Sequence, residues 1–303
     1  MTRLSGVIPP VITPLTADGA VDTASLESVL AHHLSAGVTG LFALGSSGEG
    51  VYLRDADRRL VVDVVVSVVA RQVPVFAGAV DATTNRVLDQ ARWLIDAGVD
   101  VLVVTAPFYA NVTGAETRRH FELVAAASPL PVFAYDIPGN VGRLLDEDSI
   151  LPLLADGTLA GLKDSSGDLP RFARIIERLG QARTATMLTG ADTGALAALE
   201  AGADGIVPGI GNVRPDLFVR LLSAFEQGDR ADCDRLQKEI TALTEVFRIG
   251  ERHGVGRHAS ELGGLKSALS HAGVITDPTV SPPMSPYPEP ARQELHRLMD
   301  ALA

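Results

Sequence analysis

The chain has 303 residues, of which 46% are hydrophobic and 21% are charged, which excludes a disordered chain and a protein built of membrane-spanning helices. Twenty-six basic and thirty-seven acidic residues give a formal net charge of −11, which argues against nucleic acid or an anionic membrane as the main partner. A single cysteine, Cys233, excludes an intrachain disulfide. The first residues lack the apolar stretch of a signal peptide, so we expect a cytoplasmic protein.

Short apolar segments alternate with longer amphipathic segments through the first two-thirds of the chain. Val, Ile, Leu and Ala dominate the short segments, and Gly, Pro or polar residues bound them, as is typical of buried parallel strands. In chain order the predicted strands are residues 6–13, 40–44, 73–80, 100–105, 131–136, 159–163, 186–189 and 205–208.

The amphipathic segments between these strands predict helices. Gly37, Gly98 and Gly202 each follow such a segment, at the position where a helix commonly ends in a left-handed residue. The valine-rich residues 60–70 are assigned to a helix, because residues 73–80 form the better strand. The predicted helices are residues 22–36, 55–71, 84–97, 115–127, 169–179 and 193–201.

Eight strand–helix units in about 225 residues predict a (β/α)₈ TIM barrel over residues 1–225 that carries the active site. An open, doubly wound sheet is the alternative, although no Gly-x-Gly-x-x-Gly follows the first strand. Residues 226–303 contain helix patterns without strands and are predicted to be a C-terminal helical extension. Its expected helices are residues 231–247, 261–272 and 289–302, with a proline-rich connection at residues 277–290.

The basic residues are three lysines (Lys163, Lys238 and Lys266) and twenty-three arginines. Lys163 directly follows the apolar residues 159–162, at the strand end where a parallel barrel places its active site. A solvent-exposed lysine is the alternative, but other exposed positions of the barrel use arginine. We therefore interpret Lys163 as an amine nucleophile, which burial helps to keep uncharged, that attacks a carbonyl to form a Schiff base.

Tyr135 lies near the end of the preceding predicted strand. Neighbouring strands are roughly 5 Å apart, so the phenol of Tyr135 can reach an adduct on Lys163 and move protons there. An aromatic side chain that only plugs the barrel mouth is the alternative.

Residues 45–50 (Gly-Ser-Ser-Gly-Glu-Gly) form a predicted turn between a strand and a helix. Its backbone N–H groups and the hydroxyls of Ser46 and Ser47 suit a carboxylate or a phosphate. A loop that only caps the next helix is the alternative, and Glu49 is interpreted as a brace of the turn. Farther along the chain, Asp192 is expected to cap the helix that follows it, and binding of a substrate hydroxyl is the alternative.

The seven histidines show no metal-binding spacing, and no Gly-x-Ser-x-Gly motif is present. We therefore predict no metal and no cofactor.

Three motifs in this order and spacing resemble the dihydrodipicolinate synthase / N-acetylneuraminate lyase family over the whole chain. They are Gly45-Ser46-Ser47-Gly48-Glu49, Tyr135 with Pro138, and Gly161-Leu162-Lys163-Asp164. The resemblance implies a cofactor-independent (β/α)₈ lyase that condenses or cleaves keto acids, usually pyruvate, through a lysine Schiff base. It also implies a homotetramer.

The same resemblance implies catalytic roles for matching positions. Lys163 is the expected Schiff-base residue and Tyr135 the proton-transferring phenol. Ser46 is expected in the proton relay, and Ser47 and Gly45 at the carboxylate of the keto acid.

Other matching positions concern the subunit contact and the substrate. Tyr109 matches an aromatic residue that reaches into the neighbouring subunit's site, and the carbonyl of Val207 is expected to line the pyruvate site. Asn140 stands where the synthases of lysine biosynthesis carry an arginine, and Arg143 is a nearby candidate to replace it. A bidentate arginine–carboxylate contact cannot be reproduced by asparagine.

We therefore expect an aldolase that cleaves a 4-hydroxy-2-keto acid, such as 4-hydroxy-2-oxoglutarate or a 2-keto-3-deoxy sugar acid, to pyruvate and an aldehyde. The alternatives are dihydrodipicolinate synthase and a non-catalytic protein that binds keto acids or sugar acids.

Overall fold

The computed structural model describes residues 4–302. Its sheet has eight parallel strands in the order β1-β8-β7-β6-β5-β4-β3-β2. The strands are β1 (Gly6–Val7), β2 (Leu41–Ala43), β3 (Val75–Gly78), β4 (Val101–Thr105), β5 (Val132–Asp136), β6 (Gly161–Asp164), β7 (Thr186–Thr189) and β8 (Gly205–Ile206).

The sheet closes into a barrel between its two ends. The N–H of Val11 donates to the carbonyl of Phe42 at 2.9 Å, and the N–H of Phe42 donates to the carbonyl of Pro9 at 3.0 Å. A parallel bridge between Pro10 and Phe42 lies at the same place. The predicted (β/α)₈ barrel is therefore confirmed, and the open sheet is wrong.

The first strand is much shorter than predicted. Residues 6–13 were expected to form one strand, but β1 ends at Val7. Pro9 and Pro10 follow and have no N–H groups, so the regular ladder cannot continue through them.

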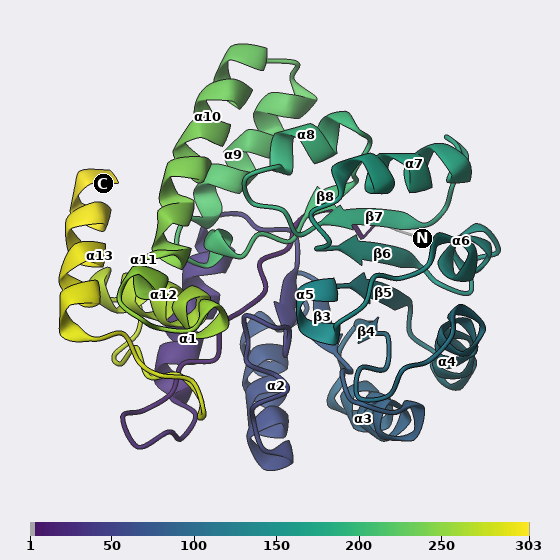
Figure 1. The fold of residues 1–303 in the computed structure, drawn as a ribbon, viewed down its shortest axis with the longest axis horizontal. Helices are drawn as coiled ribbons and strands as arrows, with labels where there is room; N and C mark the ends of the chain where they lie inside the picture. The colour runs from purple at the N-terminus through teal and green to yellow at the C-terminus, as the bar shows by residue number, and fades with distance from the viewer. Residues whose placement is uncertain (1–3, 303) are drawn as a thin grey trace.

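Helices surround the sheet in Figure 1. Those of the barrel are α1 (Thr23–Ser35), α2 (Asp55–Val69), α3 (Thr84–Ala97), α4 (Gly114–Ala127), α5 (Pro138–Val141), α6 (Glu147–Ala155), α7 (Leu169–Leu179), α8 (Ala195–Glu200) and α9 (Pro215–Glu226). Of the valine-rich residues 60–70, residues 60–69 are helical within α2, as expected, and Ala70 ends the helix in a left-handed conformation. Gly37, Gly98 and Gly202 have φ angles of 80°, 89° and 98°, which confirms the predicted left-handed helix ends.

Eight strand–helix units imply helices after β5 and β8, but no residue ranges were predicted for α5, α6 and α9. Helix α5 is a single turn, and α6 contains Pro152 in its interior, a residue that normally ends a helix. In α5 and α6 these features obscure the helical periodicity that the sequences of the longer helices display.

The C-terminal segment contains α10 (Arg230–Leu243), α11 (Ile249–Arg252), α12 (Arg257–His271) and α13 (Glu289–Leu302), with a 3₁₀ turn at Thr244–Phe247. In Figure 1 these helices, coloured green to yellow, lie on the side of the barrel that carries α1. Helix α12 begins four residues before the predicted start at residue 261. This earlier start brings further polar side chains to the barrel mouth.

A second hydrophobic cluster, separate from the larger core between strands and helices, consists of residues in or next to the strands, while other strand residues belong to the larger core. Phe42, Phe76 and Phe133 of the second cluster are almost completely buried. They fill the barrel interior below the strand ends, as bulky side chains do in this fold.

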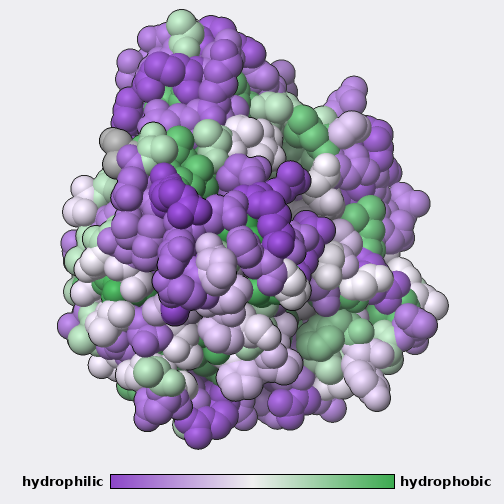
Figure 2. Space-filling model, turned by 60° about the vertical axis from the view of Figure 1, so that its left-hand side comes forward, coloured by the Kyte–Doolittle hydropathy of each residue, from purple (hydrophilic) through white to green (hydrophobic). Residues whose placement is uncertain are grey.

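Figure 2 shows the side of the molecule that carries the C-terminal helices. Hydrophilic residues cover most of this face, and hydrophobic residues appear only in small separate areas. Among residues 4–302, no helix has the length and apolarity to cross a bilayer.

Candidate active site

A cavity of about 590 Å³ opens at the carboxyl ends of the strands, a size within the usual range for small-molecule sites. Six of the residues singled out in the sequence line it together, namely Ser46, Ser47, Tyr135, Asn140, Lys163 and Val207.

Lys163 and Tyr135 lie side by side at the bottom of this cavity. They are register partners on the neighbouring strands β6 and β5. The Lys163 Nζ atom is 3.7 Å from the centre of the Tyr135 ring and 4.8 Å from the centre of the Phe42 ring. The exposed fractions of Lys163 and Tyr135 are 4% and 3%. The amine is thus held among aromatic rings, with access to solvent only through the cavity.

The turn after β2 lies next to Tyr135. The Oγ of Ser46 and the phenol oxygen of Tyr135 are 3.0 Å apart, within hydrogen-bond distance. Within residues 4–302, the N–H groups of Ser46 and Ser47 donate no hydrogen bond to another backbone group. A carboxylate in the cavity would find these two donors free. Gly50 is required at the end of the turn, because a Cβ atom there would lie 2.3 Å from the carbonyl oxygen of Leu44.

Gly45 and Tyr109 lie elsewhere. Gly45 packs beneath the turn against the Phe42 ring, where a Cβ atom would come within 2.7 Å of that ring, and it does not line the cavity. Tyr109, in the connection between β4 and α4, is 90% exposed and also lies outside the cavity of its own chain.

Arg143 is the candidate to replace the arginine that is missing at Asn140. Asn140 lines the cavity and Arg143 does not. The pKa of Glu116 is lowered mainly by hydrogen bonds with Thr113, and the charge of Arg143 adds to this effect. The charge of Arg143 thus acts on Glu116 of α4, and its side chain does not line this cavity.

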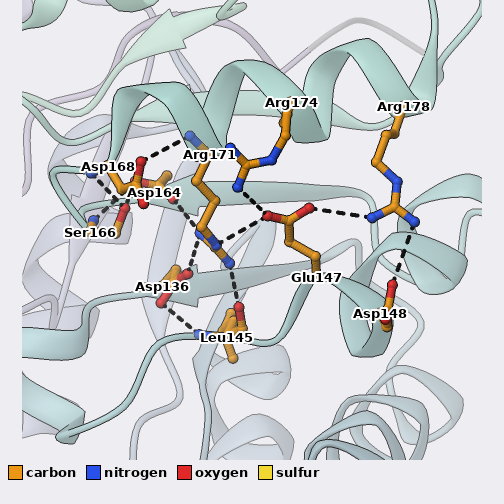
Figure 3. Close-up of polar contacts among 10 residues, drawn as sticks. All are labelled: Asp136, Leu145, Glu147, Asp148, Asp164, Ser166, Asp168, Arg171, Arg174 and Arg178. Atoms are coloured by element: carbon orange, nitrogen blue, oxygen red, sulfur yellow. Dashed lines mark hydrogen bonds and ion pairs between the residues drawn. The ribbon is translucent and has the colours of Figure 1, made fainter.

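An ion-pair network between α7 and the strands fixes the ends of β5 and β6 (Figure 3). Asp136 follows Tyr135 in the chain, and Asp164 follows Lys163. Arg171 on α7 reaches both carboxylates, with its Nη1 atom 2.9 Å from Asp136 Oδ2 and 3.2 Å from Asp164 Oδ2. The Arg171 guanidinium thereby sets the spacing between the two residues that follow Tyr135 and Lys163.

Backbone groups complete this network. Arg171 also donates to the carbonyl of Leu145, and the N–H of Leu145 donates to Asp136 at 3.1 Å. Ser166 donates to Asp164 through both its N–H, at 3.0 Å, and its hydroxyl, at 2.8 Å. Burial raises the pKa of Asp136 to about 6, although the Arg171 charge opposes this, and burial also raises the pKa of Asp164.

Replacing Arg171 by methionine is expected to lower the free energy of unfolding by about 3–5 kcal/mol at pH 8, because two buried carboxylates lose their cation. The raised pKa of Asp136 means that the stability contributed by this group falls as the pH rises through about 6. Without Arg171 that pKa rises further, so the variant should lose less stability at pH 5 than at pH 8.

Denaturant unfolding at the two pH values measures both losses. Arg174→Met is the matched control, because Arg174 pairs with Glu147 on the surface at 54% side-chain exposure. Its loss should stay below about 1 kcal/mol. An equal loss at pH 5 and pH 8 for the Arg171 variant would contradict the assignment.

Glu49 joins the turn to the C-terminal helices. Glu49 and Lys266 on α12 form an ion pair in which both side chains are fully buried. Glu49 also accepts a hydrogen bond from the N–H of Ser281 at 2.6 Å, and Lys266 donates to the carbonyl of Thr279 at 2.7 Å. The proline-rich connection is thereby tied to the turn that carries Ser46.

Asp192 does not cap helix α8, contrary to the sequence-based expectation. The helix has Gly194 at its N-cap and no side-chain cap, while the Asp192 carboxylate accepts from the N–H of Ile210 at 3.3 Å. Burial raises the pKa of Asp192 to about 7, and the positive charge of Lys163 opposes this rise. Asp192 therefore faces the cavity that contains Lys163.

Among the residues of the cavity that the sequence did not identify are four with large polar side chains. They are Tyr52, before α2, and Arg257, His258 and Glu261 on α12. The three α12 residues follow Lys163 by more than ninety positions, and no motif links them to it. The helix pattern alone could have suggested a common face, but not which part of the barrel that face covers.

Comparison with known proteins extends these observations. A sequence model of the dihydrodipicolinate synthetase family matches residues 3–302. The putative 2-dehydro-3-deoxy-D-gluconate aldolase YagE of Escherichia coli K12 is 30% identical over 98% of this chain and 97% of its own length. The 4-hydroxy-tetrahydrodipicolinate synthase 1 of Streptomyces coelicolor is 32% identical over 84% of this chain and 82% of its own length. The crystal structure of YagE in complex with pyruvate matches with a TM-score of 0.91 at 29% identity and covers 98% of each chain.

Proposed function

The chain belongs to the dihydrodipicolinate synthetase family of lyases, and from this membership we propose that it is a class I aldolase with Lys163 as its Schiff-base residue. The proposed reaction is the cleavage of a 4-hydroxy-2-keto acid to pyruvate and an aldehyde. The observation that carries the proposal is the buried cluster of Lys163 Nζ, the Tyr135 ring and Ser46 Oγ at the bottom of one cavity.

In the proposed mechanism, the neutral amine of Lys163 attacks the C2 carbonyl of the keto acid, and water is lost to give an iminium. Tyr135 moves the protons of this step, and Ser46 connects its phenol to the cavity. Tyr135 gives its proton to the departing water and is left as a phenolate, which then takes the proton of the 4-hydroxyl. The C3–C4 bond breaks, and its electron pair moves to the iminium nitrogen. An aldehyde leaves.

The resulting enamine takes a proton at C3, and water hydrolyses the imine to pyruvate and free Lys163. Throughout the cycle the carboxylate is assigned to Ser47 and the free N–H groups of the turn. Gly45 packs against the Phe42 ring within this turn, and Val207, whose carbonyl is assigned to the pyruvate site, lines the same cavity.

Asn140 favours cleavage over the synthase reaction. The synthases of lysine biosynthesis use an arginine at the matching position to bind the second substrate's carboxylate, and Arg143 lies outside this cavity. The loss of such a charged hydrogen bond costs roughly 1.5–3 kcal/mol. Dihydrodipicolinate synthase remains the second candidate, because the Streptomyces coelicolor relative of that name is 32% identical.

The exposed Tyr109 supports the proposal of a homotetramer in which this ring enters a neighbouring subunit's site. Its neighbour Phe108 is also exposed, at 38%, so two adjacent aromatic rings of this connection face solvent in the single chain. We also propose the division into a catalytic barrel at residues 1–225 and a helical extension at residues 226–303. The cytoplasmic location stays a prediction.

Coupled detection of pyruvate with a panel of 4-hydroxy-2-keto acids tests the function. We expect pyruvate from at least one member, and slower turnover of pyruvate with aspartate semialdehyde. Faster turnover with aspartate semialdehyde would establish the synthase instead. Binding of keto acids without turnover of any substrate would favour the binding protein.

A further inference from the structure

We propose that one face of helix α12 forms a distal subsite for the hydroxylated tail of a 2-keto-3-deoxy sugar acid, with Glu261 as its main hydrogen-bond acceptor. This inference rests on the proposed aldolase function and selects among its substrates. It assigns part of substrate recognition to the C-terminal segment.

The cavity has far more room than the three-carbon keto acid at Lys163 requires. Residues 257, 258, 261, 262 and 265 of α12 line its outer part. This spacing places them on one face of the helix. Leu262 and Leu265 are buried at its base, while Arg257, His258 and Glu261 supply the polar groups. A chain that extends from Lys163 toward α12 would meet these groups.

The charges on this face of α12 favour the binding of a neutral polyol over the binding of a second carboxylate group. Arg257 is compensated by Glu261, because its Nε atom donates to Glu261 Oε1 at 3.2 Å. Asp192 adds another carboxyl group on the same cavity. A dicarboxylate would therefore meet acidic groups without a free arginine, whereas sugar hydroxyls can donate to carboxylates and accept from a guanidinium.

His258 and Tyr52 complete the subsite from two sides. The rings stack with centroids 5.8 Å apart and an interplanar angle of 28°. The Nδ1 atom of His258 lies 3.8 Å from Glu261 Oε2. Its Nε2 atom is buried and has no hydrogen-bond partner among the described residues. This ring pair joins the loop before α2 to α12 and leaves one imidazole nitrogen for a ligand.

Helix α12 is also fixed relative to the keto-acid end of the cavity. Lys266, five residues beyond Glu261 on the same helix, forms the buried ion pair with Glu49 in the turn of Ser46 and Ser47. The distal groups and the carboxylate-binding turn therefore belong to one rigid arrangement. A rigid arrangement of this kind can select substrates by their length.

Glu261→Gln and Glu261→Ala test the proposal with two substrates. One is a six-carbon 2-keto-3-deoxy sugar acid, and the other is 4-hydroxy-2-ketopentanoate, which has no hydroxylated tail. We expect kcat/KM for the sugar acid to fall about 10- to 100-fold, as for the loss of hydrogen bonds to a charged group. The values for the short substrate and the rate of the pyruvate–borohydride adduct should not change.

Glu251→Gln is the matched control, because Glu251 is an exposed carboxylate that does not line this cavity. It should leave both substrates unaffected. Equal losses for both substrates in the Glu261 variants, or no loss for either, would overturn the subsite. So would a wild-type preference for 4-hydroxy-2-oxoglutarate over the sugar acid. If the wild type forms no adduct and cleaves no substrate, it is the proposed function that fails.

Discussion

Replacing Lys163 by arginine is expected to reduce the release of pyruvate by a factor of about 10⁴ or more, because the covalent route through an imine is lost. Arginine keeps the positive charge and much of the length of the side chain, but it cannot act as an amine nucleophile. A charge that only attracted the substrate's carboxylate would survive this substitution. Steady-state turnover of the best substrate in the panel measures the effect.

Lys238→Arg is the matched control, because Lys238 is exposed on α10 and lies outside the cavity. Its turnover should equal that of the wild type. A thermal unfolding curve should show that Lys163→Arg remains folded. Turnover within about tenfold of the wild type in a folded Lys163→Arg protein would rule out the Schiff base at this position.

Replacing Lys266 by methionine is expected to lower the free energy of unfolding by about 3–5 kcal/mol, because it leaves the Glu49 carboxylate buried without a cation. Both side chains have no exposed surface, so solvent cannot compensate for the lost partner. Burial lowers the pKa of Lys266, while Glu49 opposes this shift, which shows that the pair sits in a weakly solvated place. Denaturant unfolding measures the loss.

The double variant Glu49→Gln/Lys266→Met should recover part of that stability, since no unpaired charge remains. As a surface control, Arg235→Met removes ion pairs of a half-exposed arginine on α10 and should cost less than about 1 kcal/mol. A loss for Lys266→Met no larger than for this control would show that the pair does not hold the turn to α12.

The barrel was predictable because its strands are short apolar segments with clear boundaries. The proximity of Lys163 and Tyr135 was predictable for a related reason. Parallel strands end at one edge of the sheet, so residues near the ends of neighbouring strands lie close together although they are far apart in the chain. The lengths of the strands were less predictable from the sequence. The apolar pattern predicted a first strand over residues 6–13, but this strand ends at Val7, before Pro9 and Pro10.

The outer part of the site could not be predicted in this way. Arg257, His258 and Glu261 belong to a helix whose position depends on tertiary packing, including the buried pair of Glu49 with Lys266. Asp192 illustrates the same limit. Its place before a helix suggested a local cap, but its carboxylate instead accepts from Ile210, beyond the next strand.

The most direct measurement is peptide mapping by mass spectrometry after wild-type protein is treated with pyruvate and borohydride. The reduced imine should add its mass to one peptide, the one that contains Lys163. Sequencing of that peptide should place the added mass on the Lys163 side chain. An unmodified protein, or a modification found on Lys238 or Lys266 while Lys163 stays free, would contradict the proposed chemistry.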